Sequence, residues 1–134
     1  MNFTHLHVHT EYSLLDGSNK IKEYVDRVKA LGMDSAAITD HGVMYGVIDF
    51  YRAARAAGIN PILGCEVYVA PGSRFDREAG SGDDRYYHLV LLAENNQGYS
   101  NLMKIVSRDL LKDFIINHEW IFRFLRNIMR ESLH

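Results

Sequence analysis

Strand-like and helix-like segments alternate along the first part of the chain, and this order constrains the fold more than any other feature. Residues 2–8 alternate with period 2, 35–39 form a short apolar run, and 60–70 are rich in β-branched residues, which together indicate strands. Apolar residues recur at helical spacing over 19–31, behind a possible Ser18 N-cap, and over 44–58, with Gly32 and Gly58 closing the helices. This order predicts βαβ units and a mostly parallel sheet, so the fold class is α/β.

A polar stretch rich in glycine and charge, residues 71–85, predicts a loop before another strand-like segment at 86–93. No helix fits between this strand and the one before it, so we expect an antiparallel hairpin here. Pairing Val69 near Tyr86 would bring Glu66 and His88 close together across the ladder.

Composition limits the possible functions. The chain has 134 residues, 47% of them hydrophobic and 24% charged, as expected for one globular domain. Its net charge of -2 gives no general attraction to nucleic acid or to an anionic membrane. There is a single cysteine, no secretory pattern at the N-terminus and no apolar run near the roughly 20 residues of a membrane helix. We therefore expect a soluble cytoplasmic protein with no membrane partner.

Three histidines, His5, His7 and His9, stand at alternate positions of the first expected strand and would share one face of it. Ordinary core is excluded for them, because each unpartnered buried imidazole would cost roughly 1 to 3 kcal/mol. A solvent-facing edge strand remains an alternative. We favour a metal site, since two imidazoles on one strand face are a common pair of nitrogen ligands.

Further ligand types follow the other expected strands. Asp16 lies in the turn after the first strand, Asp40 and His41 in the loop after the second, and Glu66 in the third. Sites in α/β sheets form at the carboxyl ends of strands, so we expect these side chains to lie close together at that edge of the sheet. Singly, Asp16 could form a turn, Asp40 could cap a helix and Glu66 could belong to a buried ion pair. If all of these separate explanations held, several ligand-type residues would lie at one end of the sheet by chance, so we favour one shared site.

Four blocks occur in order: HLHVHTEYSLLDG, AITDHGVMYGVIDFY, GINPILGCEVYVAP and YYHLVLLAENNQGYSNLMKIVSR. Together, over residues 3–108, they resemble the start of the PHP (polymerase and histidinol phosphatase) domain at the N-terminus of bacterial DNA polymerase III α subunits. SLLDG, FYRAARAAGINPILG and NNQGYSNLMKI are more similar to the polymerase branch than to the histidinol phosphatase branch.

The resemblance implies part of a distorted (β/α)7 barrel whose strand ends hold up to two or three divalent metal ions. Carried over by position, the implied metal ligands are His7, His9, Asp16, His41, Glu66 and His88. His5 stands where other members often have aspartate, which leaves a supporting role and ligation both open. Asp40 is implied to orient its neighbour. Imidazoles and carboxylates of this kind suit zinc, manganese or iron.

Such a site implies phosphoester hydrolysis, since two metals about 3.5 to 4 Å apart polarise a phosphoryl oxygen and activate a bridging water. The resemblance implies a proofreading 3′–5′ exonuclease in some members, and in others an inactive domain that stabilises the polymerase. DNA and other replicase subunits are the implied partners. A metal-stabilised scaffold or docking module, and a stand-alone phosphatase for small monoesters, remain alternatives.

The family domain is longer than this chain. Its later ligands, including an Asp-x-His pair, and the catalytic aspartates of the polymerase palm have no counterpart here. We therefore expect an incomplete site with fewer ions, little or no turnover, and no nucleotidyltransferase activity from this chain alone.

Residues 109–134 depart from the resemblance, so we divide the chain into a partial PHP domain, 1–108, and a helical tail, 109–134. The approximate helical stripe of the tail comprises Leu110, Phe114, Ile121, Leu125 and Ile128. An added helix would cover the open side of a half barrel, meet a partner or self-associate. A remnant of a truncation or frame break, with no selected role, is the alternative that we favour.

Overall fold

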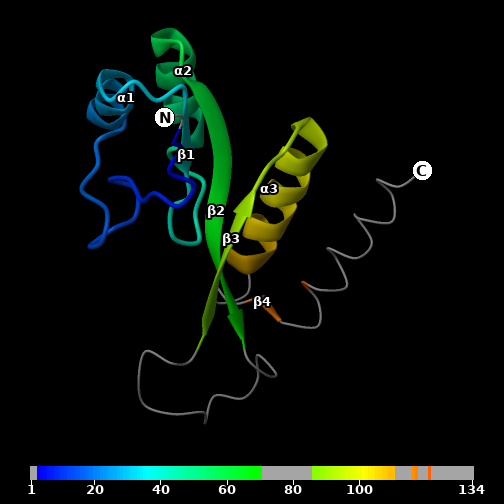
Figure 1. Ribbon diagram of the computed structural model, residues 1–134. Helices are drawn as coiled ribbons and strands as arrows, with labels where there is room; N and C mark the ends of the chain where they lie inside the picture. Colours follow the sequence, from blue (N-terminus) through cyan, green and yellow to red (C-terminus); the bar gives the residue numbers. More distant parts are fainter. Residues whose placement is uncertain (1–2, 71–85, 111–115, 118–120, 122–134) are drawn as a thin grey trace.

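The computed structural model describes residues 3–70, 86–110, 116–117 and 121. The elements are α1 (Ile21–Ala30), β1 (Ser35–Ile38), α2 (Val47–Ala57), β2 (Asn60–Ala70), β3 (Tyr87–Leu92), α3 (Asn96–Leu110) and β4 (Ile116–Asn117) (Figure 1). Helices and a mixed sheet confirm the α/β class. The described residues form one four-stranded sheet rather than a closed barrel. No helix within them is long and apolar enough to cross a membrane.

The long strand β2 organises the sheet (Figure 1). β1 pairs in parallel with the first four residues of β2, and β4 pairs in parallel with the last two. β3 runs antiparallel along the other edge, which confirms the expected antiparallel pairing. The expected loop between β2 and β3, residues 71–85, lies outside the described residues.

The register of β2 and β3 differs from the expected one by a single residue. Val69 pairs with Tyr87 rather than Tyr86, and Tyr68 lies opposite His88. Side chains alternate between the faces of a sheet, so a slip of one residue moves a side chain to the other face. The observed register is the one that puts His88 on the same face as Glu66.

The expected first strand does not form in residues 3–8. Val8 does lie beside the end of β1, where its carbonyl accepts a 2.9 Å hydrogen bond from the backbone N–H of Thr39. The N–H of Val8, however, donates to the Thr39 hydroxyl at 2.7 Å rather than to a carbonyl. The Thr39 hydroxyl thus takes the place of a backbone carbonyl as the acceptor, and regular strand pairing stops at Val8.

Both expected helices form, but each begins two or three residues later than the sequence predicted. The N-cap of α1 is Lys20 rather than Ser18, and its side chain makes no capping hydrogen bond. α2 begins at Val47, which leaves residues 41–46 as a loop. It ends at Ala57 with Gly58 as its C-cap, as expected, because the left-handed φ of 77° at Gly58 favours glycine.

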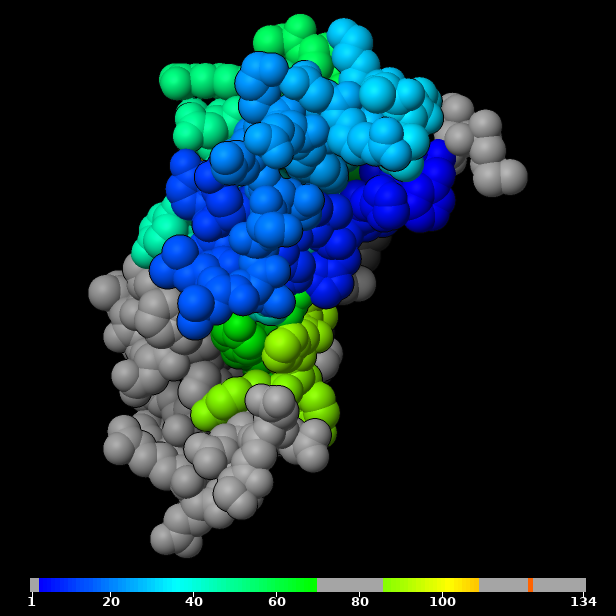
Figure 2. Space-filling view, turned by 90° about the vertical axis from the view of Figure 1, so that its left-hand side faces the viewer, coloured from blue at the N-terminus to red at the C-terminus, as the bar shows by residue number. Residues whose placement is uncertain are grey.

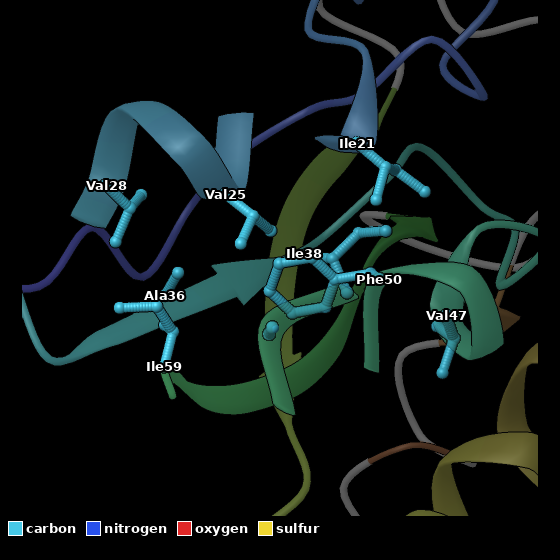
Figure 3. Close-up of a cluster of buried hydrophobic side chains, with 9 residues drawn as sticks. Ile21, Val25, Val28, Ala36, Ile38, Val47, Phe50 and Ile59 are labelled. Carbon is cyan, nitrogen blue, oxygen red and sulfur yellow. The ribbon is translucent and has the colours of Figure 1, made fainter. Parts of the chain in front are cut away.

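One core lies where α1 and α2 pack on β1. The helical spacing of their apolar residues places these side chains against the sheet: Ile21, Val25 and Val28 from α1, and Val47, Phe50 and Ala54 from α2. In Figure 3 the Phe50 ring lies beside Ile38 of β1, within this cluster. This core fixes β1 and, through it, the loop that leaves its carboxyl end.

A second core lies under α3, on one face of β2. Its buried residues are Cys65, Val67, Val69, Leu102, Ile105, Val106 and Ile121. Cys65, Val67 and Val69 of β2 therefore face α3, and Glu66 and Tyr68, which alternate with them, face the opposite side. We predicted no helix at 96–108, although the spacing of Leu102, Ile105 and Val106 is typical of one.

The tail is not one continuous helix from residue 109. α3 extends to Leu110, and β4 interrupts the expected helix at Ile116–Asn117 by pairing with the end of β2. Ile121, a member of the expected apolar stripe, is buried in the second core. The remaining residues of the expected tail helix lie outside the described residues.

Candidate metal centre

Glu66 lies at the middle of the site, and backbone pairing brings His41 beside it. The backbone N–H of Glu66 donates to the carbonyl of Asp40 at 3.0 Å, and the carbonyl of Glu66 accepts from the N–H of Gly42 at 2.7 Å. These bonds form an isolated parallel bridge between His41 and Glu66, between the β1 and β4 pairings. The Glu66 side chain is only 1% exposed.

In the described part of the chain, four histidines surround the Glu66 carboxylate. His7 contacts Oε2 through Nε2, and His9 Nε2 lies 3.1 Å from the same oxygen. His41 Nδ1 lies 3.2 Å from Oε1, and His88 Nδ1 lies 2.5 Å from it. The N-terminal segment, residues 3–10, thus supplies two imidazoles, the loop after β1 supplies one and β3 supplies one. In Figure 2 this segment, in blue, covers the middle of the molecule above exposed parts of β2 and β3, in green.

Asp16 extends the cluster on the exposed side. Its Oδ2 lies 2.7 Å from His41 Nε2 and 4.0 Å from His9 Nδ1, and its side chain is 67% exposed. The turn that holds it is closed by Gly17, whose N–H donates to the Ser13 carbonyl at 2.8 Å. A Cβ at Gly17 would lie 1.8 Å from the carbonyl oxygen of Thr10, so this close approach requires glycine.

The ligand atoms form three overlapping groups in which all atoms lie within 4.8 Å of one another. The groups are His7, His9 and Glu66; His9, Asp16 and His41; and His41, Glu66 and His88. Every residue expected from the resemblance to be a ligand is in at least one group. His9, His41 and Glu66 each belong to two, so these three join the groups into one cluster.

Asp40 and His5 lie outside these groups. The Asp40 carboxylate is buried and accepts hydrogen bonds from the Thr10 N–H at 2.6 Å and the Thr10 hydroxyl at 2.8 Å. It also accepts one from Ser13 Oγ at 2.7 Å, so it supports the turn that follows His9. His5 is exposed and packs edge-on against Phe3, with ring centroids 4.7 Å apart.

Tyr68 and Ser13 contact the cluster and were not predicted. The Tyr68 hydroxyl lies 3.1 Å from His41 Nδ1, and its ring is nearly parallel to the imidazole of His41. The sequence position of Tyr68 could have indicated this contact, because Tyr68 lies two residues after Glu66 and so shares its face of the strand. Nothing in the sequence marked Ser13, because its contacts depend on the fold of the turn.

A divalent cation fits these residues. Among the described residues, Glu66 Oε1 is a buried oxygen with no hydrogen-bond partner, although the Nδ1 atoms of His41 and His88 lie beside it. Buried carboxylate oxygens without hydrogen bonds are costly unless a cation is bound to them. A bound cation would act as a Lewis acid toward a phosphoryl oxygen and lower the pKa of a ligated water.

Comparison with known sequences decides the family, because residues 5–133 match the PHP domain family. The chain belongs to the PHP domain family. The match also covers residues 109–133, where the resemblance seen in the sequence had ended. Our division of the PHP chain at residue 108 remains a prediction.

Curated relatives of this PHP chain are named DNA polymerase III subunit alpha. Those of Treponema pallidum and Helicobacter pylori are 51% and 50% identical to it, over 81% and 84% of the chain. That of Thermus aquaticus is 44% identical over 98% of the chain. The PHP chain spans only 9 to 11% of the length of these relatives.

Two solved structures share the PHP fold described above. An amidohydrolase from Chromobacterium violaceum matches with a TM-score of 0.52 and 28% identity, over 76% of this chain and 32% of that one. A protein from Bifidobacterium adolescentis, named as a metal-dependent phosphoesterase, matches with a TM-score of 0.53 and 22% identity, over 77% and 32%. The second likeness supports the fold alone.

The electrostatics of the PHP site favour the protonation states that bind metal. Burial alone would raise the pKa of Glu66, but the hydrogen bond with His7 and the positive potential of the nearby imidazoles outweigh it and lower the pKa. Burial, followed by the charge of His41, lowers the pKa of His9. The hydrogen bond to His41 lowers the pKa of Asp16. Ionised carboxylates and neutral imidazoles are the forms that coordinate cations.

These shifts predict that the metal-free chain loses stability in acid. The pKa of His9 is below its ordinary 6.5 in the folded state, and that of Glu66 is below its ordinary 4.5. The unfolded chain therefore binds more protons below about pH 6.5, and more again below about pH 4.5, so acid favours unfolding. Urea unfolding in a chelator between about pH 7.5 and about pH 4 measures this, with His9→Gln expected to flatten the upper part of the curve. A free energy of unfolding that rises as the pH falls would contradict the prediction.

Proposed function

We propose that this chain is the N-terminal PHP part of a DNA polymerase III α subunit and carries a divalent-metal phosphoesterase site. The observation that carries the proposal is the buried Glu66 carboxylate, surrounded by four imidazoles and left with one oxygen that accepts no hydrogen bond. The names of the curated relatives support the replicative setting.

Phosphoester hydrolysis suits this cluster better than a purely structural role for the metal. Three groups that share ligands can hold cations close together, as in the two-metal mode of phosphoester hydrolysis. Structural sites are usually closed by protein ligands, whereas catalytic sites keep an open position. Here the side chains of His7 and His88 are each 52% exposed and that of Asp16 is 67% exposed, so one side of the cluster is open to a substrate.

The finer parts of the proposal concern ions, substrate and partners. We propose that the site takes zinc, manganese or iron through the six residues of the three groups, because imidazole and carboxylate ligands suit all three metals. The substrate would be the 3′ end of single-stranded DNA, and the partners would be DNA and other replicase subunits in the cytoplasm. The tail would contribute to contacts with those subunits.

Metal content of the purified chain tests the proposal. We expect bound zinc, manganese or iron in the wild type by elemental analysis, and loss of that metal in a His7→Ala, His9→Ala double variant. His5→Ala is the matched control, because His5 lies on the same segment but outside the ligand groups. The proposal fails if the wild type binds no more of these metals than the double variant.

Activity assays with added manganese or zinc then separate the possible roles. Release of nucleotides from the 3′ end of single-stranded DNA, lost in the double variant, would support the exonuclease. Hydrolysis of p-nitrophenyl phosphate alone would indicate a small-molecule phosphatase instead. Bound metal with no hydrolysis of either substrate would indicate that the metal only stabilises the fold.

A further inference from the structure

Ser13 is a buried residue of the turn after His9, and its hydroxyl has three polar neighbours. The residue is 2% exposed. Its Oγ lies 2.7 Å from Asp40 Oδ1, 3.1 Å from the backbone nitrogen of His41 and 3.3 Å from His9 Nδ1. One small side chain thus joins the buried carboxylate to two residues of the metal cluster.

The chemistry of these neighbours fixes the direction of each hydrogen bond. A serine hydroxyl has one proton to donate and two lone pairs that accept. The Asp40 carboxylate can only accept, so it takes the Ser13 proton. The backbone N–H of His41 can only donate, so it uses one Ser13 lone pair. The remaining lone pair faces His9 Nδ1, which can therefore bond to Ser13 only as an N–H donor.

A proton on His9 Nδ1 leaves Nε2 of the neutral ring unprotonated, with a lone pair that can accept a hydrogen bond or bind a metal. That nitrogen lies 3.1 Å from Glu66 Oε2 and 3.0 Å from His7 Nε2, within a ligand group. Without Ser13, the Glu66 carboxylate would favour the other tautomer, in which Nε2 carries the proton and donates to Oε2. A protonated Nε2 cannot bind a metal, so the two tautomers differ in metal affinity.

We propose that Ser13 is a positioning residue that links Asp40 to His9 and holds His9 as the Nδ1–H tautomer, with Nε2 free for a metal. The inference rests on the proposed metal site and adds a residue to it. It also gives Asp40 a role, because the Asp40 carboxylate determines that the Ser13 proton points away from His9.

The tautomer of His9 in the metal-free wild type is the first test. Long-range proton–nitrogen NMR correlations distinguish the two neutral tautomers, and the His9 signals are assigned by their loss in His9→Gln. We expect Nδ1–H in the wild type and a shift toward Nε2–H in Ser13→Ala. A wild-type ring protonated at Nε2 would overturn the proposal, and this result needs no variant of Ser13 to fold.

Metal affinity is the second test, measured with Mn²⁺ or Zn²⁺ by calorimetry. Loss of a group that orients a metal ligand costs about 10- to 100-fold in affinity, and we expect that loss in Ser13→Ala. Ser13→Thr keeps the hydroxyl and should retain most of the affinity and the wild-type tautomer. Wild-type affinity in Ser13→Ala, with the fold intact by circular dichroism, would overturn the proposal.

The two proposals can fail separately. If the wild type binds none of zinc, manganese and iron, the proposed function fails, and the NMR comparison of wild type with Ser13→Ala still decides whether Ser13 sets the tautomer. If the wild type binds metal and Ser13→Ala keeps both the tautomer and the affinity, the proposed function stands and the role of Ser13 is refuted.

Discussion

Glu66→Gln is expected to abolish tight metal binding while leaving the chain folded. Glutamine has nearly the shape of glutamate, but its neutral amide carries a donor group where the cluster needs an anionic oxygen. Glu66 belongs to two of the three ligand groups, and its carboxylate lies between imidazoles from both sides of the site. We expect a loss greater than the roughly 10- to 100-fold that follows removal of a group supporting a ligand.

Calorimetric titration with Mn²⁺ or Zn²⁺ measures this loss. The matched control is Glu94→Gln, which makes the same change at an exposed position just beyond β3 and should bind metal like the wild type. Far-ultraviolet circular dichroism confirms that both variants keep their helices. Equal affinities in the two variants would show that the metal does not use the Glu66 carboxylate.

Phe50→Ala is expected to lower the free energy of unfolding by about 3 to 5 kcal/mol. The Phe50 side chain is 0% exposed and lies among side chains of α1, β1 and α2 (Figure 3). Its ring also stacks on Tyr24, with centroids 6.0 Å apart. Small domains have about 5 to 15 kcal/mol of total stability, so this one cavity would remove a large part of it.

Urea unfolding in a chelator, followed by circular dichroism, measures the effect without a contribution from bound metal. The control is Tyr51→Ala, which truncates the neighbouring aromatic residue, 45% exposed on the outer side of α2. We expect the control to cost no more than about 0.5 kcal/mol. A similar loss in both variants would mean that Phe50 does not contribute through the core.

The parts of the fold that could be predicted are those that depend on local pattern. Apolar spacing and a closing glycine predicted α2, and β-branched residues predicted β2 with its bounds. The first strand failed because the alternation of residues 2–8 describes which side chains share a side, not whether a partner strand continues the ladder. Thr39 replaces that partner with its hydroxyl, and no local pattern reveals this.

The candidate ligand residues stood out in the sequence because their types are rare in combination. None of His7, His9 and His41 required a register. His7 and His9 stood out by their alternate spacing, and His41 by its place in the loop after an expected strand. Placing His88 required a register. The expected closeness of Glu66 and His88 is confirmed, although the pairing expected near Tyr86 is off by one residue. Requiring both side chains on one face would have selected the observed register. Ser13 and Tyr68 were missed because serine and tyrosine are common residues whose role here lies in contacts across the fold.

The alternation of β2 makes its length as important as its sequence. Cys65, Val67 and Val69 lie in the core under α3, and Glu66 and Tyr68 project from the other side toward the histidines. Substitutions of core residues on one face of β2 can therefore leave the site residues on the other face in place. An insertion or deletion of one residue within Gly64–Tyr68 would exchange the two sides, bury a carboxylate under α3 and turn an apolar side chain toward the ligands. Relatives that keep this site should therefore vary in the amino acids of β2 but not in their number.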